Sequence, residues 1–305
     1  MRRLTLIFMA LLAAAPAAWA GGTNGAPFLT IGVGARAAGM GEAFTAVADD
    51  ASAIAWNPGG LGAIDSQQLA LMHALWDADT SVDNLGYVLP LGTAGSLGLA
   101  ATYLSMQPFE ITDAANPAGN GQTIAINDLA LSLGCGLNLG QVHGLGASVK
   151  YLRRQLGAYQ ATAVAGDAGY LWKITPGLKA GAAVLNFGQP VTFISQADNL
   201  PLTCRGGLAW EALNSGQHEL TAALDVVDQV DSAVYGCVGA EYWFDSRLAL
   251  RAGYKTLPDN PSLSVGVGLQ APLLGLRQAG IDYAYTYQNG QDLTATHRLS
   301  MRCAF

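Results

Sequence analysis

The side chains best suited to catalysis or metal binding are scattered along this chain. It has four histidines at widely spaced positions: His73, His143, His218 and His297. None belongs to an H-E-x-x-H motif or a similar metal-binding arrangement, and no G-x-S-x-G nucleophile elbow or phosphate-binding loop is present. Acidic residues are equally dispersed, for example Asp128, Asp167, Asp225 and Asp282. This dispersal is typical of the polar faces of strands, so we expect no catalytic residues, no cofactor and no metal site.

A glycine series near the N-terminus invites a dinucleotide-binding interpretation. Gly32, Gly34, Gly39 and Gly41 do not follow the G-x-G-x-x-G spacing, however, and no strand–helix–strand unit comes after them. Glycines here are better explained by tight turns and by close approach of the backbone to its neighbours.

A short helix is predicted just after this glycine series. An aspartate, Asp49 or Asp50, can cap the helix N-terminus by accepting hydrogen bonds from free N–H groups. Pro58 prevents the helix from continuing beyond Asn57. Such an element, placed directly before the first strand, is either a plug in the lumen of a barrel or a cap that only fills space.

The composition restricts the class of protein. Of 305 residues 51% are apolar and 12% are charged, and the formal net charge is −7. An acidic chain lacks the clustered Lys and Arg that nucleic-acid binding needs. So few charges and so many apolar residues mean that the chain either buries most of its surface or faces lipid. Four cysteines lie far apart, where small buried or lipid-facing side chains are expected, although one or two disulfides are possible: Cys135, Cys204, Cys237 and Cys303.

The first twenty residues have the pattern of a secretory signal peptide. Arg2 and Arg3 precede an apolar stretch, and a small-x-small motif ending at Ala20 predicts cleavage after that residue. No later apolar run approaches the ~18–20 residues that a membrane-spanning helix needs. We therefore expect an exported protein, either a soluble β-protein or an outer-membrane barrel.

Alternating apolar and polar residues dominate the chain after residue 66. Segments of about 9–14 residues recur between turn signals, as in 219–226, 247–255 and 281–287. Many are longer than strands of soluble proteins and suit strands that cross a membrane. The sequence predicts an all-β fold: a transmembrane antiparallel β-barrel of about fourteen strands over 67–305, preceded by an N-terminal hatch over 21–66 that contains a short helix.

The C-terminus supports a barrel. Leu299, Met301 and Phe305 fall on one face of a closing strand, while Arg298 and Arg302 fall on the other and are expected to face a polar lumen. A terminal aromatic residue on such a strand resembles the signal that barrel assembly machinery recognises. Outer-membrane lipid and this machinery are therefore the expected partners.

Two further features bear on function. Because side chains alternate between the two faces of a strand, Leu152, Leu171 and Leu185 are expected to face inward, as a channel for hydrophobic molecules would require. Loops expected over 107–122 and 187–202 are the candidates for binding a partner; neither is very long, but loops of this size are often functional.

The N-terminal segment also carries a family resemblance. Residues 31–50, with 56–61 (Trp-Asn-Pro-Gly-Gly-Leu), look like the opening of the PorV/PorQ family, which is similar in turn to FadL-type barrels with an Asn-Pro-Ala element in the hatch. Gly59 departs from the pattern, which usually has Ala there. The hatch motif carried by this resemblance consists of Gly32, Gly34, Arg36, Gly39, Gly41, Asp49, Asp50, Trp56, Asn57 and Pro58.

This resemblance implies a fourteen-stranded barrel in the outer membrane, plugged by its N-terminus. It also implies a role like that of PorV in type IX secretion, in which exported proteins are received and passed to the surface-attachment complex. A FadL-like channel for hydrophobic small molecules is the alternative, and a structural barrel without transport activity is a third possibility.

Overall fold

The computed structural model describes most of the chain that follows the predicted signal peptide. The described residues are 24–305 without 77–78, 113–115, 118, 258–259, 274 and 289–294. The predicted signal peptide, 1–20, and its cleavage site lie outside them. Within the described residues, no helix is long and apolar enough to cross a membrane.

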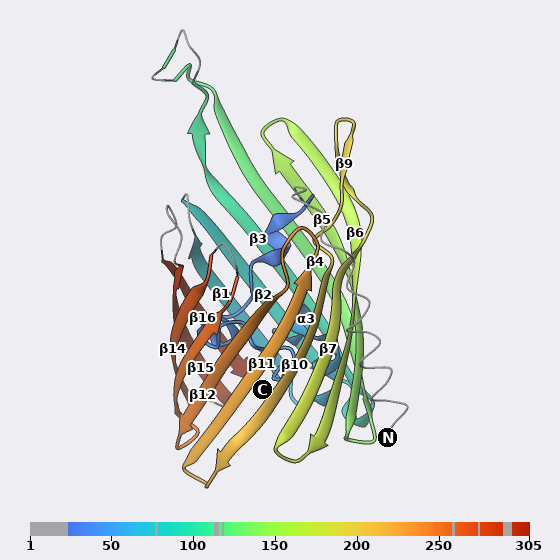
Figure 1. The fold of residues 1–305 in the computed structure, drawn as a ribbon, viewed down its shortest axis with the longest axis vertical. Helices are drawn as coiled ribbons and strands as arrows, with labels where there is room; N and C mark the ends of the chain where they lie inside the picture. Colours follow the sequence, from blue (N-terminus) through green and yellow to red (C-terminus); the bar gives the residue numbers. More distant parts are fainter. Residues whose placement is uncertain are drawn as a thin grey trace.

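Fourteen antiparallel strands close into a barrel, which confirms the predicted fold class and strand count (Figure 1). Chain neighbours pair throughout, except that β7 pairs directly with β10. The barrel strands are β1 (Gln68–Trp76), β2 (Thr80–Pro90), β3 (Gly95–Glu110), β4 (Thr123–Leu139), β5 (His143–Leu156), β6 (Tyr159–Thr175), β7 (Leu178–Gly188), β10 (Thr203–Asn214), β11 (His218–Gln229), β12 (Tyr235–Phe244), β13 (Leu248–Lys255), β14 (Ser262–Leu273), β15 (Leu276–Gln288) and β16 (Thr296–Ala304).

The first and last strands close the cylinder. β1 and β16 run antiparallel from the pair Gln68 and Ala304 to the pair Leu75 and His297. The N–H of Phe305 then donates to the carbonyl of Gln67 at 2.9 Å. Each strand of the cylinder thereby has a paired neighbour on both sides, so the barrel has no unpaired edge strand as an open sheet would.

Alternation along the strands places apolar side chains outside and charged ones inside. Leu133 and Leu250 are each 52% exposed on the outer wall, whereas Asp225 and Arg251 are buried in the interior. A soluble protein would have the opposite arrangement, with its charges in water. This inverted pattern is typical of barrels whose outer wall contacts lipid.

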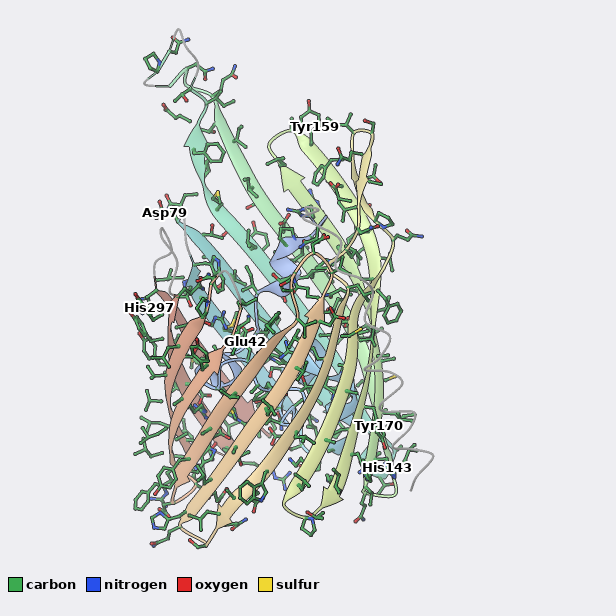
Figure 2. All side chains as sticks on the ribbon, in the orientation of Figure 1. Glu42, Asp79, His143, Tyr159, Tyr170 and His297 are labelled. Carbon is green, nitrogen blue, oxygen red and sulfur yellow. The ribbon has the colours of Figure 1, made fainter. Side chains whose placement is uncertain are left out.

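Pairs of histidine and tyrosine side chains lie on the outer wall near one end of the barrel. His143 bonds the Tyr170 hydroxyl at 2.7 Å, and His218 bonds the Tyr242 hydroxyl at 2.6 Å. Figure 2 shows His143 and Tyr170 near the end of the barrel opposite Asp79 and Tyr159. Rings with one apolar side and one polar edge suit the boundary between lipid and water.

Two predicted loops are partly strand. β3 continues to Glu110 and β4 starts at Thr123. The neighbouring strand β2 pairs with β3 only as far as Met106, and β5 pairs with β4 only as far as Ile126, so this hairpin extends beyond both neighbours. It projects past the rest of the rim in Figure 1. The loop predicted over 187–202 instead contains a small sheet of β8 (Val191–Phe193) and β9 (Gln196–Asp198). The expectation for 107–122 was wrong in extent, because Pro108 lies at a bulge within a continuing strand. The segment 189–202 does connect two barrel strands, β7 and β10.

The N-terminal segment forms four short helical elements inside the barrel. They are η1 (Pro27–Thr30), α2 (Ala35–Gly39), α3 (Ala53–Trp56) and η2 (Pro58–Ala63). Figure 1 shows this segment, in blue, enclosed by the strands. Helix α2 was not predicted, although Ala35, Ala37 and Ala38 are strong helix formers.

Helix α3 corresponds to the predicted helix and ends before Pro58 as expected. The predicted aspartate cap was wrong, because Ser52 is the N-cap residue. The side chain of Asp50 instead accepts a hydrogen bond from the Ser52 N–H at 2.9 Å. It therefore stabilises the turn that leads into the helix rather than the helix end itself.

The four cysteines, all within the described residues, are free. Cys135 and Cys204 are exposed on the outer wall and Cys237 is buried. The possible disulfides are therefore absent, and the prediction of small buried or lipid-facing side chains holds.

Candidate functional site: the hatch and the lumen

Arg36 fixes helix α2 to the barrel wall. Its Nε and Nη2 atoms donate to the two carboxylate oxygens of Glu241, both at 2.8 Å. Its Nη1 atom pairs with Asp49 at 2.6 Å and with Asp50 at 3.1 Å. Burial alone would lower the pKa of Arg36, but the three carboxylates outweigh it and raise the pKa well above its ordinary value. The paired fork geometry makes this a strong, directional attachment.

The charges continue along the inner wall from Glu241. Arg251 bonds Glu241 at 2.6 Å and Asp282 at 2.8 Å. Arg302 then bonds the second oxygen of Asp282 at 2.8 Å. The result is a chain of alternating charges that crosses β12, β13, β15 and β16 and ends at the hatch.

A second attachment holds the turn at Phe44 and Thr45. One carboxylate oxygen of Asp225 accepts from both backbone N–H groups at 3.0 and 2.9 Å, and from the Thr45 hydroxyl at 2.6 Å. Arg205 pairs with the same oxygen at 3.0 Å and lies 4.8 Å from the centre of the Trp56 ring. A buried carboxylate with this many donors holds the hatch backbone at one place.

Glu42 forms a third attachment, in the middle of the barrel (Figure 2). Its carboxylate pairs with Lys255 at 2.6 Å and with Arg298 at 3.6 Å. Burial alone would raise the pKa of Glu42, but these positive charges outweigh it and lower the pKa to about 2. Glu42 therefore stays ionised over the whole range in which outer membranes function.

The Asn57–Pro58 step anchors the far side of the hatch. The side-chain amide of Asn57 donates to the carbonyls of Thr45 at 2.8 Å and Tyr170 at 2.9 Å. Its side-chain oxygen accepts from the Gly59 N–H at 3.0 Å. Asn57 thereby joins two turns of the hatch to strand β6, which explains the need for an amide with both donors and an acceptor at this position.

Glycines on both partners allow the hatch backbone to touch the wall. Gly41 has φ of +61°, and a β-carbon on it would lie 2.6 Å from the Tyr254 nitrogen. A β-carbon on Gly39 would lie 3.1 Å from the Cα of Gly266. On the wall, a β-carbon on Gly253 would overlap Gly41 and Met40. No larger residue fits at Gly41 or Gly253 without moving the hatch.

The structure thus brings the predicted hatch residues together inside the barrel, at separate contacts with the wall. Arg36, Asp49 and Asp50 form one cluster, while Asn57 and Pro58 lie across the hatch near β5 and β6. Trp56 donates from its ring nitrogen to the Val33 carbonyl at 2.9 Å. Gly34 has φ of +90°, and a β-carbon on Gly32 would overlap the Glu42 carboxylate.

Sequence reasoning missed the partners of these residues. Glu241, Asp225 and Arg205 are separated from the hatch by more than a hundred positions. Of these, only Asp225 was expected, as a charge on the polar face of a strand. Their alternation along the strands indicates that they face the lumen, but nothing in the sequence links them to particular hatch residues.

The lumen above the hatch contains an apolar cluster. It consists of inward side chains of the barrel together with hatch and β8–β9 residues: Ala26, Phe28, Met72, Ala74, Val82, Leu104, Ala130, Leu152, Ala161, Ala163, Ala165, Val191 and Leu200. Leu152 is fully buried in it, and Leu171 and Leu185 are also buried, as their parity predicted. Leu185 and Phe28 line a small cavity of about 70 Å³ at the upper face of the hatch.

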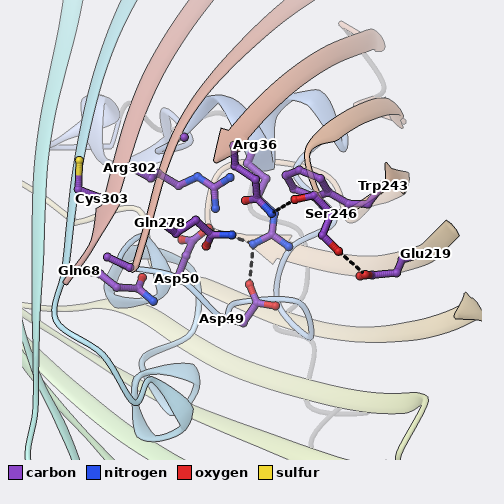
Figure 3. Close-up of a pocket in the computed structure, with 13 residues that line it drawn as sticks. Arg36, Asp49, Asp50, Gln68, Glu219, Trp243, Ser246, Gln278, Arg302 and Cys303 are labelled. Carbon is purple, nitrogen blue, oxygen red and sulfur yellow. Dashed lines mark hydrogen bonds and ion pairs between the residues drawn. The ribbon is translucent and has the colours of Figure 1, made fainter. Parts of the chain in front are cut away.

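On the opposite face of the hatch a polar cavity of about 380 Å³ opens at the end where β1 begins and β16 finishes. Figure 3 shows Arg36 in its wall, with Asp49, Arg302 and Trp243 around it. Within the described part of the chain, no group of histidine, cysteine or acidic residues could hold a metal ion.

The residues of the predicted assembly signal lie on the outer wall. Leu299, Met301 and Phe305 are all exposed there, and Arg298 and Arg302 point inward. Their recognition by assembly machinery stays a prediction.

Residues 20–305 match the model of an uncharacterised protein family, UPF0164. The chain belongs to this family. A UPF0164 protein of Treponema pallidum (strain Nichols) is 30% identical over 191 residues, which cover 56% of this chain and 46% of the relative. The match thus spans about half of the relative's length.

Solved structures resemble this UPF0164 chain in fold. The toluene transporter TbuX of Ralstonia pickettii has a TM-score of 0.67 and 15% identity, covering 90% of this chain and 98% of the transporter. The CymD monoaromatic hydrocarbon channel has a TM-score of 0.65 and 14% identity, with 90% and 96% covered. A Pseudomonas aeruginosa FadL homologue has a TM-score of 0.55 and 13% identity, with 88% and 97% covered.

The fold of this UPF0164 chain is therefore that of a FadL-like barrel, as the resemblance implied. Membership of the PorV/PorQ family is not confirmed, since the matching family model is UPF0164. The type IX secretion role stays a prediction.

Proposed function

We propose that this chain is an outer-membrane channel for small hydrophobic molecules, with an N-terminal hatch over 21–66 that closes the barrel over 67–305. The observation that carries this proposal is the apolar cluster inside the lumen. A barrel that only admits polar solutes has a water-filled, polar interior. An apolar interior next to a closed hatch offers instead a place where a hydrophobic molecule can leave water.

The position of the cluster supports this proposal. Leu104, Ala130 and Leu152 come from three successive strands, and Phe28 of the hatch packs against them from within. Burial of about 100 Å² of ligand surface there would contribute roughly 2.5 kcal/mol. The small side chains of Ala161, Ala163 and Ala165 extend the cluster along one strand.

Two of the similar barrels are named for apolar molecules. TbuX is a toluene transporter and CymD a monoaromatic hydrocarbon channel. We infer a comparable substrate class for this chain, namely small molecules whose surface is mainly apolar.

We place the barrel with its short turns toward the periplasm. Two- and three-residue connections, such as 176–177 and 215–217, lie at the end where the barrel begins and finishes, whereas 189–202 at the other end holds the β8–β9 sheet. Short turns face the periplasm in bacterial barrels of this kind. The hatch would then separate the lumen from the periplasm.

Uptake of radiolabelled toluene by cells that produce the chain tests this function. An unpartnered amide in an apolar site costs about 1–3 kcal/mol, so we expect Leu152→Gln to reduce uptake by roughly tenfold. Leu156→Gln is the matched control, because Leu156 lies exposed at the end of the same strand. Equal uptake by cells with and without the chain would overturn the proposal.

A further inference from the structure

Three cavities adjoin along one edge of the hatch. The upper cavity of about 70 Å³ and a neck of about 20 Å³ share Val33 and Asn84. The neck and the 380 Å³ cavity on the other face share Arg36, Asp50 and Arg302. In this order they lie between the upper face of the hatch and the end of the barrel beside β1 and β16.

The neck is narrow and polar. It lies where the chain at Gly34 and Ala35 passes the wall: the Gly34 N–H donates to the Met72 sulfur at 2.9 Å, and the Ala35 N–H donates to the Ser300 hydroxyl at 2.8 Å. A space of about 10–15 Å³ for the centre of a water is the least that one molecule needs. The neck therefore has room for a water or a small ion, and none for an organic molecule.

Among the charged groups that line the neck, the carboxylate oxygens are occupied and one donor is free. Asp50 accepts from Ser52 with one oxygen and from Arg36 with the other. Both oxygens of Asp282 are held by arginines, at 2.8 Å each. The Nη2 atom of Arg302 is buried and has no hydrogen-bond partner. A buried donor of this kind is normally satisfied by water or by an anion.

We propose that this edge of the hatch is a passage for water and small inorganic anions such as chloride, whose upper mouth opens beside the apolar cluster. Its neck is too small and too charged for an apolar solute. The proposal stands independently of hydrophobic uptake, because it rests on the neck and on the free guanidinium nitrogen alone.

Osmotic shrinkage of proteoliposomes tests the passage. We expect the purified full-length protein to speed shrinkage over protein-free vesicles. Ala70→Phe, which fills the neck from β1, should return the rate to the protein-free value. Ala147→Phe, on the lipid-facing side of β5, should leave the wild-type rate unchanged. Wild-type vesicles that shrink no faster than empty ones, or a folded Ala70→Phe protein that keeps the wild-type rate, would overturn the proposal.

A second variant covers the case in which Ala70→Phe does not fold. In planar bilayers with a KCl gradient, the wild-type reversal potential should show a preference for chloride. Arg302→Met removes the free donor, while Arg251 still holds Asp282, so the preference should shift by several-fold toward potassium. An unchanged reversal potential would show that ions cross elsewhere, and the passage would be refuted.

Discussion

The contact between hatch and wall at Gly253 gives the sharpest prediction. Gly253→Ala adds a single β-carbon on the inner face of β13, where it would overlap the backbone at Met40 and Gly41. Backbone cannot rotate away as a side chain can, so the hatch must withdraw from this strand. Forcing an extra methyl group into a packed interior costs about 1–3 kcal/mol, and backbone contact places this case at the upper end.

A cost of about 3 kcal/mol corresponds to a roughly hundredfold larger population of displaced hatch. Trypsin cleavage after Arg36 measures that population, because the side chain is held by Glu241 while the hatch is docked. We expect cleavage in detergent to be faster by up to two orders of magnitude in Gly253→Ala. The folded barrel of this variant should still migrate differently in unheated gel samples than in heated ones, as the wild type should.

Gly206→Ala is the matched control. Gly206 lies in β10, and a β-carbon on it would meet no atom within 4 Å. Its cleavage rate should equal that of the wild type. If Gly253→Ala also cleaves at the wild-type rate while the barrel is folded, the hatch is not held by backbone contact and our description of its docking is wrong.

Four other outcomes are expected. Arg36→Met breaks a buried ion pair and should destabilise the docked hatch by about 3 kcal/mol. The urea concentration at the midpoint of trypsin cleavage should therefore be lower. An unchanged midpoint would contradict the role of Glu241. The pKa of Glu42 is lowered to about 2, so the stabilisation of the docked hatch by its carboxylate is complete above the ordinary pKa near 4.5 and should be lost as the pH falls from there toward 2. In Glu42→Gln, resistance of the hatch to protease should therefore depend less on pH over that range. A variant whose resistance falls in parallel with that of the wild type would refute this role of Glu42. Sequencing of the mature protein should begin at Gly21, and a retained leader would refute cleavage. Deleting Phe305 should reduce the amount of folded barrel in the outer membrane, and normal assembly would exclude it from the signal.

The barrel could be predicted from the sequence because its pattern is local. Along β13, Leu250 and Tyr254 alternate with Arg251 and Lys255, and strand geometry alone assigns them to opposite faces. The same parity placed Leu152 inside the lumen. Turn residues were less reliable, since Pro108 marks a bulge in β3 rather than its end.

The docking of the hatch could not be predicted in this way. Arg36 and Glu241 are 205 positions apart, and their contact depends on the closure of the whole cylinder. Likewise, nothing near Gly253 in the sequence indicates that Gly41 will lie against it. The resemblance at Asn57 and Pro58 located the hatch, but only the closed barrel shows what each of its side chains holds.

The most direct test of the proposed channel is a diffraction experiment on crystals soaked with bromobenzene, a small apolar molecule whose bromine can be located by anomalous scattering. Our account predicts a bromine peak inside the lumen among Phe28, Ala130 and Leu152. Bromine found on the lipid-facing wall alone, with that cluster empty at saturating concentration, would contradict it.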